Sequence, residues 1–596
     1  MWWPGGVRFV NEGRRVGSAG QAPWAFPPPW VRQWQRAWLT GDLTAGLVVA
    51  VMLVPQSLAY AMLAGLPPQV GLFASLLPLL AYAVFGSSGS LSVGPAAITS
   101  LMVAQSLAPL ATPGSLTYQA MAWCLALGSG LLMLLMGVLR LGFLSQLLSR
   151  PVVQGFTVAS AILIFAGQVA PLMGWPSLGY TVPEMLWSAW KQVSTPSDVQ
   201  AGDALMGLGA LLALGVGPRM VSALGRLSHW PVAGVQIASR LWPLVVLVLA
   251  TLVASWMGAQ TDLHPALVGS VGRGDAVAGA TWSTLASLGR DDLRGLVMPV
   301  LLIGLVSFVS SVSVAQAFAL KRGERIDADR ELLGLGLANV GGAVLGGMPV
   351  AGGLSRSVVN EAAGARSPLA GIVTAVLLGL LLLTMMPVLA YLPKAALAAV
   401  IIMAVAGLIE WQALRSAWRY DRAEAWSFLS TAVGVLLIGF EAGIMLGMAW
   451  SMGAMIWRHS QPHMAAVGRV PGTEHFRNMA RHQVECLPGV LMVRVDESLD
   501  FTNIQRVEQR LCELIHGQTS SRLVVLLLSA VNHIDHTAMQ SLLELDQALK
   551  DQGKTLYLAE IKGPVMDRLQ AGDLARRFEG RCFMSAQQAW TALSCV

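Results

Sequence analysis

Long apolar segments separated by short loops fill the chain from Leu43 to about Trp457, and they constrain the fold more than any other feature. A helix needs about 20 apolar residues to cross a bilayer. The sequence offers fourteen candidate spans, two of them too short to cross: residues 43–64, 69–86, 94–109, 118–139, 151–173, 203–217, 241–258, 294–320, 331–346, 354–363, 368–390, 395–410, 424–440 and 441–457. Only 12% of the residues are charged, against about 25% in soluble proteins. The pattern therefore predicts an α-helical polytopic membrane protein and argues against a soluble enzyme.

Positive charge is distributed unevenly over the predicted loops. With a cytoplasmic N-terminus, thirteen lysines and arginines fall in inside loops and four in outside loops. The inside set is Arg140, Arg150, Arg219, Arg226, Arg240, Lys321, Arg322, Arg325, Arg330, Arg366, Arg415, Arg419 and Arg422; the outside set is Lys191, Arg273, Arg290 and Lys394. Because cytoplasmic loops are enriched in Lys and Arg, this asymmetry predicts cytoplasmic chain ends and a plasma (inner) membrane location. It also explains the pI of about 9.2 without a nucleic-acid partner.

Residues 1–42 form a tail that we expect to be cytoplasmic. No apolar stretch appears before Leu43, so the tail is not a signal peptide. Its tryptophans recur every four residues, at Trp30, Trp34 and Trp38. Residues with this spacing share one helix face, which predicts a short helix lying at the membrane interface.

The composition changes after Trp457. Residues 458–485 are polar and contain Pro and Gly, as is typical of a linker. Residues 486–596 alternate three predicted strands (490–495, 523–529 and 555–560) with two predicted helices (503–516 and 537–551). This alternation predicts a cytoplasmic α/β domain. Four of the five cysteines lie in the last 111 residues without metal-ligand spacing, so we expect no metal site and no cofactor.

Two short segments resemble one another. Ala83–Ala97 (AVFGSSGSLSVGPAA) and Ala343–Ser357 (AVLGGMPVAGGLSRS) share AVxG and continue through Gly and Ser or Pro into a short helix. They precede the third and tenth spans, and a seven-span offset inverts one half relative to the other. Paired, Gly/Pro-interrupted short spans are a sequence indication of a transporter's substrate site.

The chemistry predicted for these segments is anion binding. We expect one half-helix to start at Gly94 and Pro95, with Pro95 in its first turn, and the other to follow Gly352 and Gly353. Each helix N-terminus carries roughly half a positive charge, and two facing N-termini make an anion site. Arg356 lies in the first turn of the second half-helix, where an arginine is costly unless it is paired or faces water.

Several motifs resemble those of SulP anion transporters, a family of sulfate permeases and anion exchangers. They are Val54–Phe73 (VPQSLAYAMLAGLPPQVGLF), Ser92–Ala97 (SVGPAA), Asp327–Asn339 (DADRELLGLGLAN) and Gly352–Asn360 (GGLSRSVVN). In addition, Val525–Ala538 (VLLLSAVNHIDHTA) is similar to the core of a STAS domain. The resemblance covers nearly the whole chain after residue 38.

This resemblance implies a fold of seven plus seven inverted spans, divided into core and gate domains, with a C-terminal STAS domain. It implies secondary active, alternating-access transport of a small inorganic anion, with sulfate as the first expectation, by a protein that is commonly a homodimer. The implied substrate-binding residues are Gln56, Tyr60, Ala96, Ala97, Leu354, Ser355 and Arg356. Bicarbonate or a dicarboxylate remains an alternative substrate, because helix ends and one arginine suit any compact oxyanion.

Two positions leave the mechanism open. Many bacterial relatives have Glu where this chain has Ser310, so the resemblance puts proton coupling at this position in doubt. In the C-terminal domain, Asp535 and Thr537 occupy the neighbourhood in which STAS modules of bacterial regulators are phosphorylated. That allows an alternative function as a membrane-anchored sensor, although helix capping by Asp535 or Thr537 is the simpler interpretation.

Overall fold

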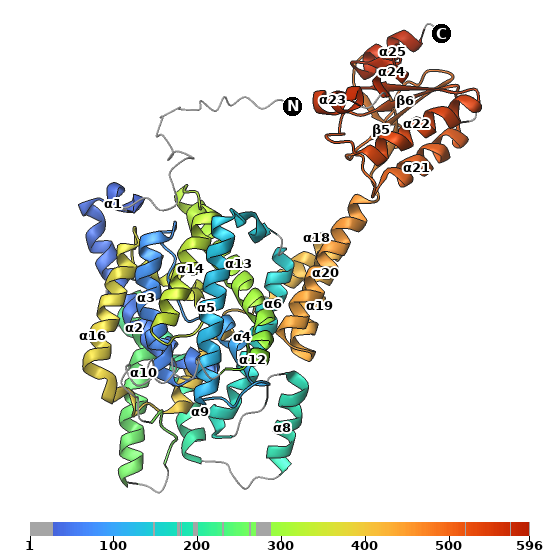
Figure 1. Ribbon diagram of the computed structural model, residues 1–596. Helices are drawn as coiled ribbons and strands as arrows, with labels where there is room; N and C mark the ends of the chain where they lie inside the picture. The colour runs from blue at the N-terminus through green and yellow to red at the C-terminus, as the bar shows by residue number, and fades with distance from the viewer. Residues whose placement is uncertain are drawn as a thin grey trace. The chain divides into compact units, whose positions relative to one another are not determined.

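The computed structural model describes residues 28–146, 149–175, 179, 181–194, 201–228, 232–260, 264–269, 288–409, 411–518, 520–571 and 574–594. The chain divides into two compact units, Met1–Met448 and Ala449–Val596 (Figure 1). The division falls inside helix α20 (Phe440–His459).

The first unit is almost entirely helical. Its principal helices are α2 (Leu39–Leu63), α3 (Pro68–Phe85), α4 (Ala97–Leu107), α5 (Leu116–Val138), α6 (Arg150–Gly167), α7 (Val169–Met173), α8 (Val182–Ser194), α9 (Ala201–Leu227), α10 (Val232–Gln260), α12 (Arg290–Gly295), α13 (Val297–Arg322), α14 (Ala328–Val344), α15 (Leu354–Ala362), α16 (Leu369–Leu389), α17 (Lys394–Ala406), α18 (Trp411–Tyr420) and α19 (Arg422–Leu437). Every predicted span coincides with one of these helices or with α20, and residues 151–173 form two consecutive helices. Within the described residues, seven helices are long and apolar enough to cross a membrane. Shorter apolar helices are α4, α17 and the Leu369–Thr384 part of α16. The count of fourteen spans stays a prediction.

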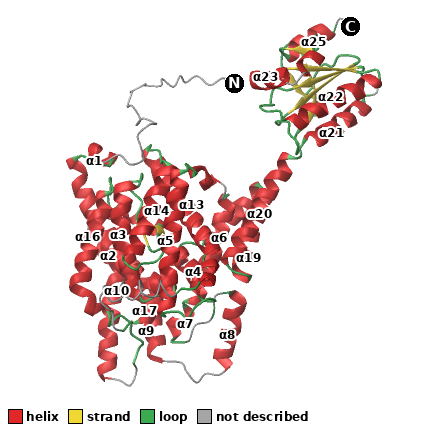
Figure 2. Cartoon of the chain, viewed as in Figure 1, coloured by secondary structure: helices red, strands yellow, loops and turns green. Residues whose placement is uncertain are grey.

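The helices of this unit pack in two groups. In one group α14 packs against α3 and α5, and α16 packs against α2 and α3; in the other α19 packs against α6, and α9 against α10 and α17 (Figure 2). These groups correspond to the predicted core and gate. Close approach is possible because small residues lie at the crossings. A Cβ on Gly71 of α3, for example, would overlap the backbone carbonyl of Ser57 in α2.

The predicted tryptophan-bearing interfacial helix is wrong. The chain forms a five-residue helix α1 (Pro29–Gln33), an extended stretch at Trp34 and Gln35, and a 3-10 turn (Arg36–Trp38) that leads into α2. Trp30 instead donates its indole N–H to the carbonyl of Ala83 at 2.7 Å, a tertiary contact that sequence periodicity does not report. The rest of the predicted tail, residues 1–27, lies outside the described residues.

Figure 2 shows a β-sheet in the second unit. The sheet has six strands in the order β4-β3-β5-β6-β7-β8. Its strands are β3 (Met464–Arg469), β4 (Phe476–Asn478), β5 (Val490–Val495), β6 (Leu523–Leu527), β7 (Thr555–Ala559) and β8 (Cys582–Phe583). Strands β5 to β8 run parallel, as crossover helices require. One face packs on α21 (Ile504–Gly517), α22 (His536–Asp551) and α23 (Gly563–Ala571), and the other face on α25 (Ala586–Leu593). A short helix α24 (Leu574–Arg577) follows α23.

The linker predicted for residues 458–485 is also wrong, because this stretch supplies two strands of the sheet. Strand β3 pairs antiparallel with both β4 and β5. Its residues are alternately half-buried and buried over Met464–Val467, as expected for a strand with one face on a core. The Pro471-Gly472 pair that indicated a linker lies in the turn of this hairpin, where Gly472 adopts a φ of +72°. Glycine accepts such an angle without steric cost.

Candidate functional site

The two interrupted segments meet as a two-stranded ribbon in the helical unit. Strand β1 (Val93–Gly94) pairs antiparallel with β2 (Ala351–Gly352), and the Gly353 N–H donates to the carbonyl of Ser92 at 3.0 Å. Non-helical backbone at membrane depth must find its hydrogen bonds inside the protein. The ribbon meets this need and brings the N-terminal ends of α4 and α15 together.

Polar side chains from neighbouring helices fix the segment before α15. Asn339 of α14 donates to the carbonyl of Val350 at 3.0 Å and accepts from its N–H at 2.9 Å. Ser311 of α13 accepts from the N–H of Gly352 at 2.8 Å. Both side chains are fully buried. They therefore satisfy the backbone groups that the ribbon itself leaves unpaired.

The segment before α4 is fixed in the same way by α15. Ser357 accepts from the N–H of Ser92 at 3.0 Å, and Asn360 donates to the carbonyl of Ser90 at 3.0 Å. Sequence reasoning missed all four of these residues. The available signal was an isolated Asn or Ser in an otherwise apolar helix, which in a membrane protein indicates a hydrogen bond to another segment.

The first half-helix starts slightly later than predicted, whereas the second follows Gly353 as expected. Helix α4 begins at Ala97 with Ala96 as its N-cap, so Pro95 precedes the N-cap and is not in the first turn. The reason is the extended conformation of Ala96 (φ −130°, ψ 148°), which follows directly from the β1 pairing. Helix α15 begins at Leu354 with Gly353 as its N-cap. Neither cap has a side chain that could accept from the first-turn N–H groups.

Arg356 lies in the first turn of α15 and is buried, with 1% of its surface exposed. Its Nη1 donates to the carbonyl of Pro95 at 2.5 Å, and Nε and Nη2 have no hydrogen-bond partner among the described residues. The guanidinium group lies against two glycines: a Cβ on Gly353 would come within 2.8 Å of Nη2, and one on Gly94 within 3.4 Å. These glycines leave the space that the charged group occupies.

Two other predicted residues line a cavity of about 330 Å³ between α2, α10, α15 and α17. Gln56 of α2 is 6% exposed and contributes a side-chain oxygen, Oε1, that has no partner in the described part of the chain. Ser355 lies at the first turn of α15 and is exposed. The rest of the lining is almost entirely apolar. The cavity therefore offers polar groups chiefly at the α2 and α15 walls.

The remaining predicted binding residues are not among the residues that line this cavity. Tyr60, one turn after Gln56 on α2, is buried and close enough to Arg356 for an electrostatic interaction. Ala97 is buried, Ala96 is half-buried and Leu354 is 45% exposed. The structure thus brings all seven residues to α2 and the two half-helix ends, but only Gln56 and Ser355 to one cavity.

Ser310 is half-buried in α13 and its hydroxyl donates to the carbonyl of Ser307, one turn earlier, at 3.2 Å. The adjacent Ser311, rather than Ser310, contacts the ribbon. Helix α13 contains no Asp or Glu. A carboxylate that sequence reasoning overlooked is Glu331 of α14, which is fully buried and accepts hydrogen bonds from Tyr82 and Ser87.

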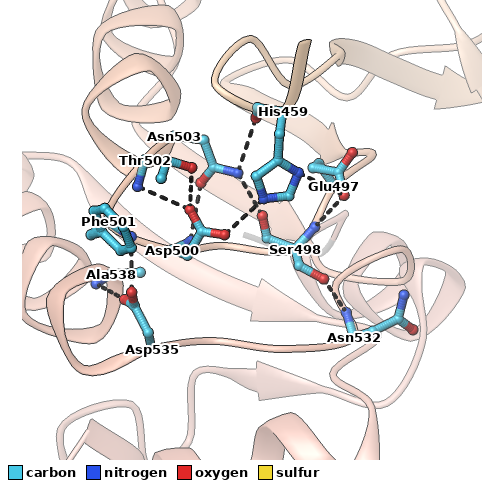
Figure 3. Close-up of polar contacts among 10 residues, drawn as sticks. All are labelled: His459, Glu497, Ser498, Asp500, Phe501, Thr502, Asn503, Asn532, Asp535 and Ala538. Carbon is cyan, nitrogen blue, oxygen red and sulfur yellow. Dashed lines mark hydrogen bonds and ion pairs between the residues drawn. The ribbon is translucent and has the colours of Figure 1, made fainter. Parts of the chain in front are cut away.

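In the second unit, Asp535 is the N-cap of α22 (Figure 3). One carboxylate oxygen accepts from the N–H of Ala538 at 2.8 Å and the other from the N–H of Phe501 at 2.9 Å. Thr537 is exposed in the first turn of the same helix. The capping interpretation is therefore confirmed for Asp535, and its carboxylate is occupied by structural contacts.

Figure 3 also shows the contacts at the end of α20, where His459 pairs with Asp500 at 2.7 Å. Burial alone would raise the pKa of Asp500, but hydrogen bonds from Thr502 and His459 outweigh it and hold that pKa below its usual value. Asn503 donates to the carbonyl of Ser498 at 2.8 Å. These contacts fix the loop between β5 and α21 to the residue that ends α20.

Comparison with known proteins identifies both units. The sulfate permease family matches residues 39–431, and the STAS domain matches residues 481–589. A probable sulfate transporter from Mycobacterium tuberculosis is 32% identical over 580 residues, which cover 96% of this chain and 98% of the relative. Probable sulfate transporter 4.2 from Arabidopsis thaliana is 33% identical over 546 residues, covering 89% and 77%.

Solved structures show the same fold. The murine Slc26a9 anion transporter in an inward-facing state superposes with a TM-score of 0.83 at 19% identity, covering 98% of this chain and 97% of that one. The transmembrane domain of the cyanobacterial bicarbonate transporter BicA gives a TM-score of 0.58 at 22% identity, covering 70% and 99%.

Proposed function

This chain belongs to the sulfate permease family, and from that premise we propose that it carries a small inorganic anion, first of all sulfate, across a membrane by alternating access. The names of the sulfate transporters that it resembles along most of its length support sulfate. The family consists of transporters rather than enzymes, and our proposal is that an ion gradient or an exchanged counter-ion drives transport.

The observation that carries this proposal is the incomplete pairing of Arg356. A buried guanidinium group costs several kcal/mol unless its donors are satisfied. Two of its nitrogens have no partner in the described residues, and they lie beside the uncapped N-termini of α4 and α15. Roughly half a charge from each helix end and one from Arg356 total about +2. A sulfate dianion would neutralise this charge and supply the missing acceptors.

Orientation and assembly are part of the proposal. The distribution of Lys and Arg over the loops supports cytoplasmic chain ends and a cytoplasmic STAS domain in the plasma (inner) membrane. The resemblance to a family whose members are commonly dimers supports a homodimer. Residues 43–457 are then the transport domain, and the STAS domain is its cytoplasmic attachment.

Labelled-sulfate uptake into proteoliposomes tests the proposal. We expect saturable uptake by the wild type and a loss of at least about 100-fold in Arg356→Gln, because removal of a buried charged hydrogen bond costs about 3 kcal/mol or more. Arg322→Gln is the matched control: Arg322 also donates to a backbone carbonyl, that of Ala365 at 2.7 Å, but at the far end of α13. Normal uptake with unchanged apparent affinity in Arg356→Gln would contradict the assignment.

The same assay separates the alternatives. Excess bicarbonate or succinate should compete with labelled sulfate less well than unlabelled sulfate does. Stronger competition by either one would reassign the substrate. A folded wild-type protein that moves none of these anions would favour the membrane-anchored sensor.

A further inference from the structure

A cluster of arginines lies in the helical unit, outside the half-helix site. It lines a cavity of about 640 Å³ between the start of α6, helix α18 and the start of α19. Arg150 is the first residue of α6, and Arg415 and Arg419 lie on α18. All three side chains are exposed, and within the described residues none of them makes an ion pair or a side-chain hydrogen bond. Glu424 is the one acidic residue of the lining.

Helix α18 presents its polar side to this cavity. Gln412, Arg415, Ser416 and Arg419 all line the cavity, and their spacing of three or four residues places them on one helix face. The opposite side is apolar. Leu414 packs against the main hydrophobic core, and the ring of Trp418 lies 6.1 Å from that of Trp426 in α19. A basic amphipathic helix of this kind is typical of a membrane surface.

The surroundings of the cavity fit a lipid better than a free ion. Trp418, Tyr420 and Trp426 are 48%, 91% and 49% exposed, as expected of the aromatic residues that gather at the lipid headgroup level. Further along α19, Val433 and Leu437 are 49% and 54% exposed and continue an apolar surface away from the cavity. A headgroup phosphate would contact the arginines while its acyl chains cover that surface.

We propose that this cavity binds the headgroup of an anionic phospholipid. Arg150, Arg415 and Arg419 contact the phosphate, and Glu424 limits the affinity by repulsion. Basic pockets between membrane helices on the cytoplasmic side are suited to such headgroups, and Arg binds phosphate through two parallel hydrogen bonds. The arginine-rich loops predicted to be cytoplasmic include all three arginines. The proposal concerns lipid binding and does not depend on which anion the protein transports.

Thermal unfolding of the delipidated full-length protein in detergent tests the proposal. Dioctanoyl phosphatidylglycerol should raise the Tm saturably, while dioctanoyl phosphatidylcholine and inorganic phosphate should not. The triple variant Arg150→Gln/Arg415→Gln/Arg419→Gln should weaken the apparent affinity for phosphatidylglycerol at least about 10-fold. Arg219→Gln/Arg226→Gln is the matched control and should bind as the wild type does, because these arginines are exposed on α9 and donate to carbonyls of their own helix.

A variant that gains affinity keeps the test independent of misfolding. Glu424→Gln removes the only acidic residue among the described lining residues, so it should tighten phosphatidylglycerol binding and make it more sensitive to salt. Equal responses of the wild type, the triple variant and Glu424→Gln would overturn the proposal. An equal Tm shift with inorganic phosphate would also overturn it, because the cavity would then be a free-anion site.

Discussion

Both units of the molecule bury charged side chains, and two of these, Asp546 and Arg356, have opposite surroundings. Asp546 of α22 has no exposed side-chain surface and pairs with Arg581 at 2.6 Å, Lys550 at 2.8 Å and Arg577 at 3.4 Å. Arg356 of α15 is 1% exposed and, within the part of the chain that the structure describes, hydrogen-bonds to a single backbone carbonyl through one of its three nitrogens.

Under the proposed function, this difference separates a charge that stabilises the fold from a charge that binds the transported anion. Burial of any charge is expensive, and a chain that needs the charge only for its fold surrounds it with its own partners. Asp546 is saturated in this way. Among the described residues, two nitrogens of Arg356 have no hydrogen-bond partner, and they lie beside two uncapped helix ends. In our proposal a bound anion supplies the missing acceptors.

The largest expected effect tests whether the second unit is self-contained. A fragment of residues 460–596 should fold cooperatively in water, whereas a fragment of residues 486–596 should not form a stable sheet. The shorter fragment lacks β3, which pairs with β5 and contributes Ala465 and Val467 to one of the two cores. Circular dichroism and thermal unfolding measure the difference. Equal stability of both fragments would mean that residues 458–485 serve only as a linker and do not stabilise the sheet.

The second prediction tests directly whether the two buried charges differ in their contribution to stability. Asp546→Ala should lower the free energy of unfolding of the 460–596 fragment by about 3 kcal/mol, because it leaves a cluster of three cations without its anion. Arg356→Met should leave the Tm of the full-length protein in detergent unchanged or raise it, since a buried unpaired charge is replaced by an apolar side chain. A large loss of stability in Arg356→Met would show that Arg356 is structural too.

Sequence reasoning identified Arg356 as a candidate site residue but did not predict its surroundings. Local patterns were sufficient for the repeat, for Arg356 and for strands β5 to β7, because each depends on residues that are close together in the chain. The partner of Arg356 is the carbonyl of Pro95, 261 residues away, and no local pattern indicates such a contact. The shift in the start of α4 has the same origin, because β1 pairs with a strand from the other half.

The third prediction concerns acid stability of the sheet unit. Burial would raise the pKa of Asp546, but hydrogen bonds and charges from Arg581 and Lys550 outweigh it and hold that pKa below its usual value. A carboxyl group with a lowered folded-state pKa contributes stability above its unfolded pKa of about 3.9 and loses that contribution as the pH falls through the folded value.

Urea unfolding of the 460–596 fragment at a series of pH values measures this loss. Below about pH 4 the wild type should lose stability more steeply than Asp546→Asn does, because only the wild type must protonate this carboxyl group. Glu508, whose pKa burial raises, acts in the opposite sense in both proteins and cancels in the comparison. Parallel curves for the two proteins would mean that the ion pairs of Asp546 contribute little to stability.

The smallest expected effect concerns coupling at Ser310. This hydroxyl bonds to its own helix, and a hydroxyl cannot release a proton at physiological pH. Uptake by the wild type should therefore persist when an imposed proton gradient is removed. Ser310→Glu introduces a group that can bind and release a proton, so a proton gradient should now change its initial rate, whereas the neutral control Ser310→Gln should behave as the wild type does. Collapse of wild-type uptake without the gradient would place proton coupling at another group. The first group to substitute would then be the buried carboxylate of Glu331. It accepts hydrogen bonds from Tyr82 and Ser87, next to the segment that leads into β1.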